Sequence, residues 1–296
     1  MKKYALLVLC LCSIYACREE RPAVVERPVF DVRNSSTLEV DKIEMSDSAT
    51  VLYVDAFFQP NSWIRISGET YIKESGGSEK LVVTKSEGIS LGEEFYMPAS
   101  GNASFKLFFP PLPPNVVKID FIESDCSDCF KTWGIRLLPS DKVKIDPIPS
   151  DILAGKTSEP LPPPAFTQGT AKVKGRYLGY VEGYFMSGNE VTLSLGEILN
   201  TNDLHQVKLP IAADGSFSGE IPLDRPQLAR LGENRIFLSP NETCEIYIDL
   251  KKSCRSQGRY RTDKEAGDTL STYVRSSYLS WSDALALNKA PKLYEY

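Results

Sequence analysis

Apolar side chains recur at every second position in three runs between residues 102 and 138. This spacing predicts strands with one buried face, because successive side chains of a strand point to opposite sides. Residues 110–114 contain four prolines, which cannot donate to a central ladder and predict an extended connection at a sheet edge. Residues 123–129 are polar and predict a hairpin loop. The three runs are Phe105, Leu107, Phe109; Val117, Ile119, Phe121; and Trp133, Ile135, Leu137.

The same pattern extends over residues 37–146 and predicts a first β-sandwich domain. Short alternating segments separated by Gly and Pro turns are typical of that architecture. Gly76-Gly77 is typical of a hairpin turn. We expect strands at residues 37–45, 49–58, 63–67, 69–74, 79–85, 103–109, 116–123 and 131–138.

A second β domain follows a change in composition. Residues 147–164 read PIPSDILAGKTSEPLPPP and predict a proline-rich, semi-rigid linker. Residues 165–250 again show strand patterning, and Asp214-Gly215 is typical of a hairpin turn. The expected fold class is therefore all-β, with two β-sandwich-like domains joined by this linker.

Residues 251–296 form a tail of different character. Apolar side chains there recur at a spacing of three to four residues, which predicts a helix at residues 268–288. This stripe either docks on the second domain or begins a further module. Its members include Leu270, Tyr273, Val274, Tyr278 and Trp281.

The first 17 residues have the pattern of a lipoprotein signal peptide. Two lysines precede an apolar stretch at residues 5–12 that is too short to span a bilayer. The sequence IYAC resembles a lipobox, so we expect Cys17 to become the lipidated N-terminus. Residues 18–36 mix charges and prolines and predict a flexible tether. The expected location is the cell envelope, with the lipid in the outer membrane and the protein on its periplasmic face or at the cell surface.

The charge and the single histidine restrict the function classes. A net charge of −5 argues against a nucleic-acid binder, which needs a basic face. A Ser-His or Cys-His centre would have to use His205, and this residue lies in the polar segment NTNDLHQ, which predicts a solvated loop. No catalytic constellation, metal site or cofactor site is identifiable, so a non-enzymatic protein is favoured.

Cys126-Ser-Asp-Cys129 allows two interpretations: a redox dithiol, or a local structural disulfide or pair of spectator thiols. A reactive CxxC thiolate is stabilised by a helix N-terminus and positive charge. Here three acidic residues surround the pair and a strand follows it. The structural interpretation is therefore favoured.

Two further cysteines lie near the end of the second domain. Cys244 shares one strand face with Ile246 and Ile248, which predicts a small core residue. A Cys244–Cys254 bond is a further candidate disulfide in an oxidising compartment.

Several segments resemble the all-β region found upstream of the thioredoxin-fold module in TlpA-like disulfide reductase lipoproteins of Gram-negative bacteria. They are EGISLGEEFYMPASGNASFKL, FKLFFPPLPPNVVKIDFIESDCSDCFKTWGIRL, KVKGRYLGYVEGYF, DGSFSGEIPL and LSPNETCEIYIDL. The family's Trp-Cys-x-x-Cys module would lie beyond Tyr296, and nothing in this chain matches it. The resemblance therefore implies an accessory β region and carries over no catalytic residue.

The leading functional expectation is a non-catalytic, envelope-anchored lipoprotein that binds or docks protein partners, as such an accessory region would. One alternative is a surface glycan-binding lipoprotein, although packing roles are favoured for its aromatic residues. Another is a redox exchange partner of an envelope thioredoxin, acting through Cys126 and Cys129. The aromatic candidates for glycan stacking are Trp63, Tyr71, Phe95, Tyr96 and Trp133.

Overall fold

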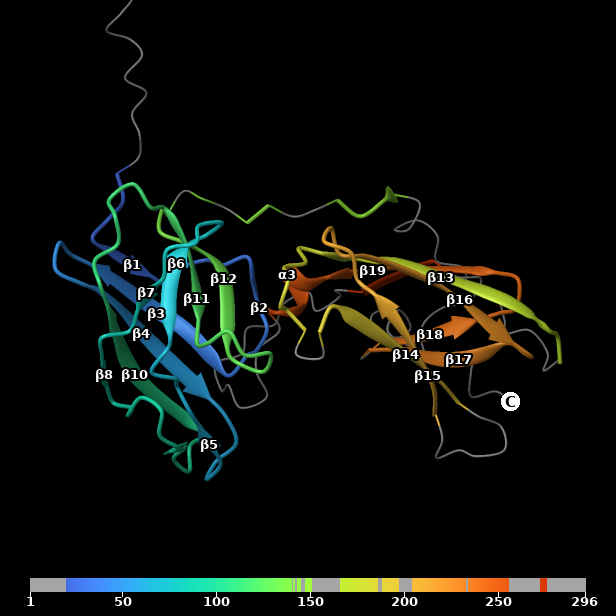
Figure 1. The fold of residues 1–296 in the computed structure, drawn as a ribbon, viewed down its shortest axis with the longest axis horizontal. Coiled ribbons are helices and arrows are strands. Elements are labelled where there is room, and N and C mark those ends of the chain that lie inside the picture. The colour runs from blue at the N-terminus through green and yellow to red at the C-terminus, as the bar shows by residue number, and fades with distance from the viewer. Residues whose placement is uncertain are drawn as a thin grey trace, which may run out of the picture.

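The computed structural model describes residues 20–139, 141, 143–144, 147–150, 166–185, 188–196, 204–232, 234–255 and 272–275. The predicted signal peptide, Cys17 and most of the proline-rich linker lie outside these residues. The described chain is almost entirely β-structure, in two sandwich-like domains that lie side by side in Figure 1. The prediction of an all-β, two-domain fold is confirmed.

The first domain consists of two five-stranded antiparallel sheets and a short ribbon. Its strands are β1 (Val24–Glu26), β2 (Val32–Arg33), β3 (Leu38–Met45), β4 (Thr50–Phe57), β5 (Trp63–Ile64), β6 (Tyr71–Glu74), β7 (Leu81–Val82), β8 (Lys85–Glu87), β9 (Phe95–Tyr96), β10 (Asn102–Phe109), β11 (Lys118–Ile122) and β12 (Lys131–Arg136). One sheet has the order β1-β3-β4-β10-β8 and the other β2-β12-β11-β6-β7, while β5 and β9 form the ribbon. Most predicted strands are present, although the segment at 79–85 divides into β7 and β8.

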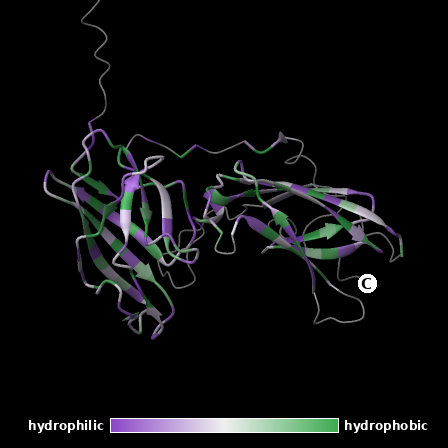
Figure 2. Ribbon diagram, in the orientation of Figure 1, coloured by the Kyte–Doolittle hydropathy of each residue, from purple (hydrophilic) through white to green (hydrophobic). Residues whose placement is uncertain are grey.

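The core of this domain forms from the alternating positions. In β4, and in β10 from Phe105 onward, every second side chain is buried, and the two strands pair in register along their length. The alternation of hydrophobic and hydrophilic residues along these strands is visible in Figure 2. Gly76 supplies the positive φ of 85° that the predicted β6–β7 turn requires, because a side chain rarely adopts that conformation.

A β-bulge in β12 changes which way Trp133 points. Two residues of β12, Trp133 and Gly134, lie opposite the single residue Asp120 of β11. Gly134 has φ of 70°, and its N–H is accepted by the Asp120 carboxylate at 2.9 Å. The extra residue puts Trp133 on the opposite face from Ile135. The prediction that these two side chains share a face is therefore wrong.

The prediction of a flexible tether at residues 18–36 is wrong for residues 20–36. Within that segment β1 pairs with β3, and β2 pairs with β12. Val25 and Val32 are buried, so the free energy of apolar burial offsets the entropy cost of ordering the segment. The segment completes both sheets of the first domain.

The second domain packs two four-stranded sheets. Its elements are β13 (Gly169–Leu178), β14 (Glu190–Gly196), β15 (Leu204–Pro210), β16 (Ser216–Leu223), β17 (Gln227–Leu231), β18 (Asn234–Leu238), β19 (Thr243–Asp249), α3 (Leu250–Ser253) and β20 (Thr272–Arg275). The sheet orders are β16-β13-β19-β20 and β15-β14-β17-β18, and β13 with β19 is a parallel pair. The short helix α3 begins at the N-cap Asp249, whose side chain accepts from the Lys252 N–H at 3.0 Å.

Two local predictions in this domain need correction. Asp214 and Gly215 do form a turn, which Ala212 and Ser216 close, but β15 and β16 belong to different sheets, so the turn connects two layers. The tail helix predicted at 268–288 is wrong at residues 272–275, which form β20 and pair with β19. Tyr273 and Val274 suit a strand because aromatic and β-branched residues fit a pleated surface, and the open edge of β19 supplies the backbone partners.

Candidate functional site

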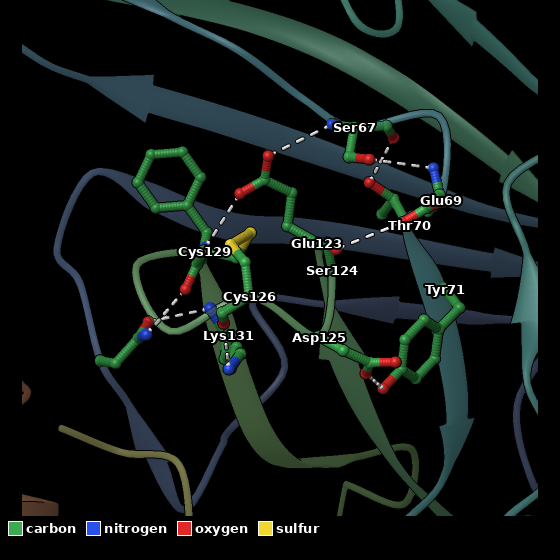
Figure 3. The surroundings of a disulfide bond; sticks show 12 residues. Ser67, Glu69, Thr70, Tyr71, Glu123, Ser124, Asp125, Cys126, Cys129 and Lys131 are labelled. Carbon is green, nitrogen blue, oxygen red and sulfur yellow. Dashed lines mark hydrogen bonds between the residues drawn. A yellow bond between two sulfur atoms is a disulfide. The ribbon is translucent and has the colours of Figure 1, made fainter. Parts of the chain in front are cut away.

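Cys126 and Cys129 form a disulfide in the loop between β11 and β12, with Cα atoms 5.4 Å apart (Figure 3). The predicted hairpin is confirmed, since β11 and β12 are antiparallel neighbours. Cys126 is exposed and Cys129 is buried. The structure therefore contains the bonded state of the pair, which a structural disulfide and an oxidised redox pair have in common.

Side chains from outside the loop hold the backbone of both cysteines. The Asn34 side-chain amide donates to the Cys129 carbonyl at 2.8 Å, and its oxygen accepts from the Lys131 N–H at 2.8 Å. The Lys131 ammonium donates to the Cys126 carbonyl at 2.7 Å. Asn34 directly follows β2, the strand that pairs with β12, so residues from the N-terminal part of the domain position the disulfide.

Glu123 points inward at the base of the loop (Figure 3). Its two carboxylate oxygens accept from the Ser67 N–H at 3.2 Å and the Phe130 N–H at 3.0 Å. Burial raises the pKa of Glu123 because it disfavours the charged form, while the two N–H donors act in the opposite direction. Glu123 therefore bridges the two ends of the loop, at residues 123 and 130, and links them to Ser67.

Asp125 is paired on the outer side of the loop. Its carboxylate accepts from the Tyr71 hydroxyl at 2.8 Å and pairs with the Lys80 ammonium at 2.7 Å. Hydrogen bonds from Lys80 and Tyr71 lower the pKa of Asp125. The chain enters β12 directly after Phe130, so Cys129 has no helix N-terminus behind it to stabilise a thiolate.

We expect the Cys126–Cys129 pair to have a reduction potential below about −300 mV, the range of structural disulfides. The reason is that the loop is held in its bonded conformation by hydrogen bonds from Asn34 and Lys131. Thiol trapping of the purified protein across glutathione and dithiothreitol poises measures this potential. Asn34→Ala should raise the potential, and Asn115→Ala, at an exposed position, should leave it unchanged.

A potential nearer −200 mV with fast exchange would contradict this prediction. It would identify a labile dithiol and favour the redox-exchange alternative over a structural loop.

The face of the first domain beside this loop packs against the second domain. Val32, Tyr71, Ile122 and Trp133 belong to the same buried apolar cluster as the core of the second domain. Their shared face follows from the register, since Trp133 lies opposite Val32, and Ile122 lies opposite Tyr71. The ring centroids of Trp133 and Tyr184 are 6.3 Å apart. We call this shared region the junction.

Two arginines add polar contacts to the junction. The Arg33 guanidinium, only 5% exposed, donates through Nε to the Cys254 carbonyl at 3.1 Å. Arg255 of the second domain donates to the carbonyls of Phe30 and Asp31. Both guanidinium carbons lie 5.2 Å from the Phe30 ring centroid, within cation–π range. The junction therefore combines apolar burial with charged hydrogen bonds.

The predicted Cys244–Cys254 disulfide is wrong, because the structure has two separate buried thiols. Cys244 lies near the start of β19 and packs in the core, as predicted for that residue. Cys254 follows α3 beyond the other end of the strand, and five residues of strand extend about 16 Å. Burial raises the pKa of Cys244 to about 12 and also raises the pKa of Cys254, so both thiols stay protonated at neutral pH.

The predicted loop position of His205 is wrong, although its exposure is confirmed. His205 lies on β15 opposite Leu195 and lines a groove of about 570 Å³ at one end of the second domain. Asp224 and Arg225 also line this groove, and they pair with each other at 2.8 Å. Arg225 also donates to the Gly196 carbonyl, so its guanidinium is engaged by the walls of the groove.

The five aromatic candidates for glycan stacking separate into two groups. Tyr71 and Trp133 are buried and Phe95 is half-buried, as the packing interpretation predicts. Trp63 and Tyr96 lie opposite each other across β5 and β9, so their side chains share one face of the ribbon. They are 46% and 61% exposed, respectively. Only this pair is available for stacking on a ligand.

Comparisons with known proteins found no matching family model, no similar curated protein and no similar solved structure. The similarity to the TlpA-like accessory region therefore stays a prediction. Across the described residues, no helix is long and apolar enough to cross a membrane. In the same part of the chain, no three His, Cys, Asp or Glu side chains are grouped in a way that could hold a metal ion.

Proposed function

We propose that this chain is a lipid-anchored protein of the cell envelope that acts by binding a protein partner, with its lipid on Cys17. The observation that carries the proposal is the junction, where one apolar cluster extends from the first domain into the core of the second. Two sandwiches packed in this way form a single extended platform rather than two independently moving modules. A stable platform suits docking, since little conformational entropy is lost when a partner binds.

The partner class that the sequence resemblance favours is a thioredoxin-fold domain. We expect the mature protein to bind such a domain saturably in a surface-binding titration. The Cys126→Ser/Cys129→Ser variant should bind with the same affinity, because docking needs no disulfide exchange. Loss of binding in that variant, with its fold intact by circular dichroism, would overturn docking in favour of redox exchange. No saturable binding by the native protein would contradict the proposed partner class.

Glycan binding is a second candidate function, favoured by the exposed pair Trp63 and Tyr96. Two aromatic faces on one ribbon can stack on sugar rings, and Tyr96 also donates its hydroxyl to Glu94 at 2.8 Å. If this function is present, affinity electrophoresis on polysaccharide gels should retard the native protein. Trp63→Ala should abolish the retardation, and Phe166→Ala, an exposed aromatic of the second domain, should retain it. Equal mobility with and without every polysaccharide would exclude the candidate.

A further inference from the structure

Residues 21–26 are bound to the first domain, only a few residues after Cys17, the expected lipid attachment site. The Arg21 guanidinium donates to the carbonyls of Pro113 at 2.8 Å, Val116 at 2.9 Å and Leu112 at 3.2 Å. A guanidinium that donates to three carbonyls holds its own backbone near that loop. Four residues further along, Val25 is buried in β1, which pairs with β3.

The length of chain before this attachment limits how far the domain can lie from the bilayer. Cys17 and Arg21 are four residues apart, and four extended residues span at most about 14 Å. A lipid on Cys17 would therefore keep Arg21 and the loop that it binds within that distance of the membrane surface. This reach is much shorter than that of a tether extending to residue 36.

We propose that the first domain rests on the bilayer through one defined surface, formed by residues 46–49 and 110–116. We call this surface the anchor end. The inference rests on the proposed lipidation of Cys17. Both segments lie where the N-terminal chain attaches: Arg21 binds carbonyls of the 110–116 loop, and Met45, directly before residue 46, donates its N–H to the Ala23 carbonyl at 2.8 Å. The two segments are joined where Leu112 donates its N–H to the Thr50 hydroxyl at 3.1 Å.

The composition of the 110–116 loop suits contact with lipid headgroups. Residues 110–116 read PPLPPNV and contain no charged side chain. Pro111, Pro113 and Pro114 are exposed. Bringing this loop against a membrane therefore desolvates no charged side chain, whereas Asp47, the one charged residue of the 46–49 turn, is exposed and has to stay among the hydrated headgroups.

The opposite end of the domain points away from the bilayer. β4 runs from Thr50 at the anchor end to Phe57, and eight residues of strand extend about 26 Å. The β5–β9 ribbon with Trp63 and Tyr96 follows that far end, and in Figure 1 β5 lies at the end of the domain opposite β1. The disulfide loop lies on the same side, where Glu123 binds Ser67. The exposed aromatic pair is thus presented outward.

Short-range quenching by headgroup-labelled lipid tests this orientation. The full-length lipidated protein is placed in phosphatidylethanolamine–phosphatidylglycerol vesicles with a fluorophore on Asn115→Cys or on Glu93→Cys. Asn115 is exposed at the anchor end, and Glu93 is exposed beside the far ribbon. The four cysteines among the described residues are buried or disulfide-bonded, so an otherwise native protein treated identically gives the labelling background. We expect severalfold stronger quenching at position 115 than at position 93.

Lengthening the tether gives the matched control. A flexible Gly/Ser segment inserted between Arg18 and Glu19 should leave the protein bound to vesicles but remove most of the difference between the two probes. Equal quenching of both probes in the native-length protein, with the protein floating on vesicles, would overturn the anchor-end proposal alone. Failure of the native protein to float would instead overturn lipidation at Cys17, and the orientation with it.

Discussion

Trp133→Ala is expected to lower the free energy of unfolding by about 3–5 kcal/mol, the cost of removing a large aromatic side chain from a packed core. Trp133 is only 8% exposed and lies in the cluster that the two domains share. Its removal leaves a cavity between Val32 of the first domain and Tyr184 of the second. Because these two residues belong to different domains, they cannot both move in to close the cavity. Both the stability of the first domain and its attachment to the second should therefore decrease.

Urea unfolding followed by tryptophan fluorescence and circular dichroism measures this effect. Trp63→Ala is the matched control, because it makes the same substitution in the same domain at a side chain that is 46% exposed. We expect its cost to stay below about 1 kcal/mol, as is usual for surface positions. Equal losses for Trp133→Ala and Trp63→Ala would contradict the buried junction.

Arg33→Met is expected to cost about 1.5–3 kcal/mol, the range for hydrogen bonds made by a charged group. Methionine fills most of the volume of the arginine stem but cannot donate to the Cys254 and Leu38 carbonyls. The Cys254 carbonyl belongs to the second domain, so the variant loses a bond across the junction as well as one inside the first domain. Part of the loss should therefore appear as separate unfolding of the two domains.

Differential scanning calorimetry on Arg33→Met shows both parts of this expectation, as a lower midpoint and a broadened or divided transition. Arg27→Met provides the control. The Arg27 side chain is 86% exposed and reaches Asp41 only at 3.9 Å, so its replacement should change the stability by less than about 0.5 kcal/mol. A single unshifted transition for Arg33→Met would show that the guanidinium contributes no net stability to the junction.

The disulfide loop shows which features can be predicted from local sequence and which cannot. The polar segment between two alternating runs predicts the hairpin, and three-residue spacing makes a Cys126–Cys129 bond geometrically accessible; both are present. What holds the loop could not be predicted, because Asn34 is far away in the chain and reaches it only after β2 pairs with β12. The resulting network is a property of the sheet.

The exposed aromatic pair shows the same limit. Composition identifies five aromatic candidates, and a preference for packing is correct for Tyr71 and Trp133. Nothing local to Trp63 or Tyr96 distinguishes them, because their exposure depends on the β5–β9 pairing and on the absence of a covering layer over that ribbon in the described structure. For Trp133, the sequence did contain one signal of its altered orientation. The next residue, Gly134, is a glycine inside a strand pattern, and such a glycine often marks a bulge.

By itself, the sequence determined the all-β class, two domains and most strands of the sandwiches, since a period of two depends only on neighbouring residues having one face in the core. Only the tertiary structure decided the junction, the order of residues 20–36 and the strand β20. Each of these depends on partners distant in the chain: β1 needs the edge of β3, β20 needs the edge of β19, and Trp133 faces the second domain because a bulge at Gly134 turns it. Backbone pairing and burial at such edges are set by the assembled sheets, so a local pattern can mark the bulge at Gly134 but not the distant partners of these segments.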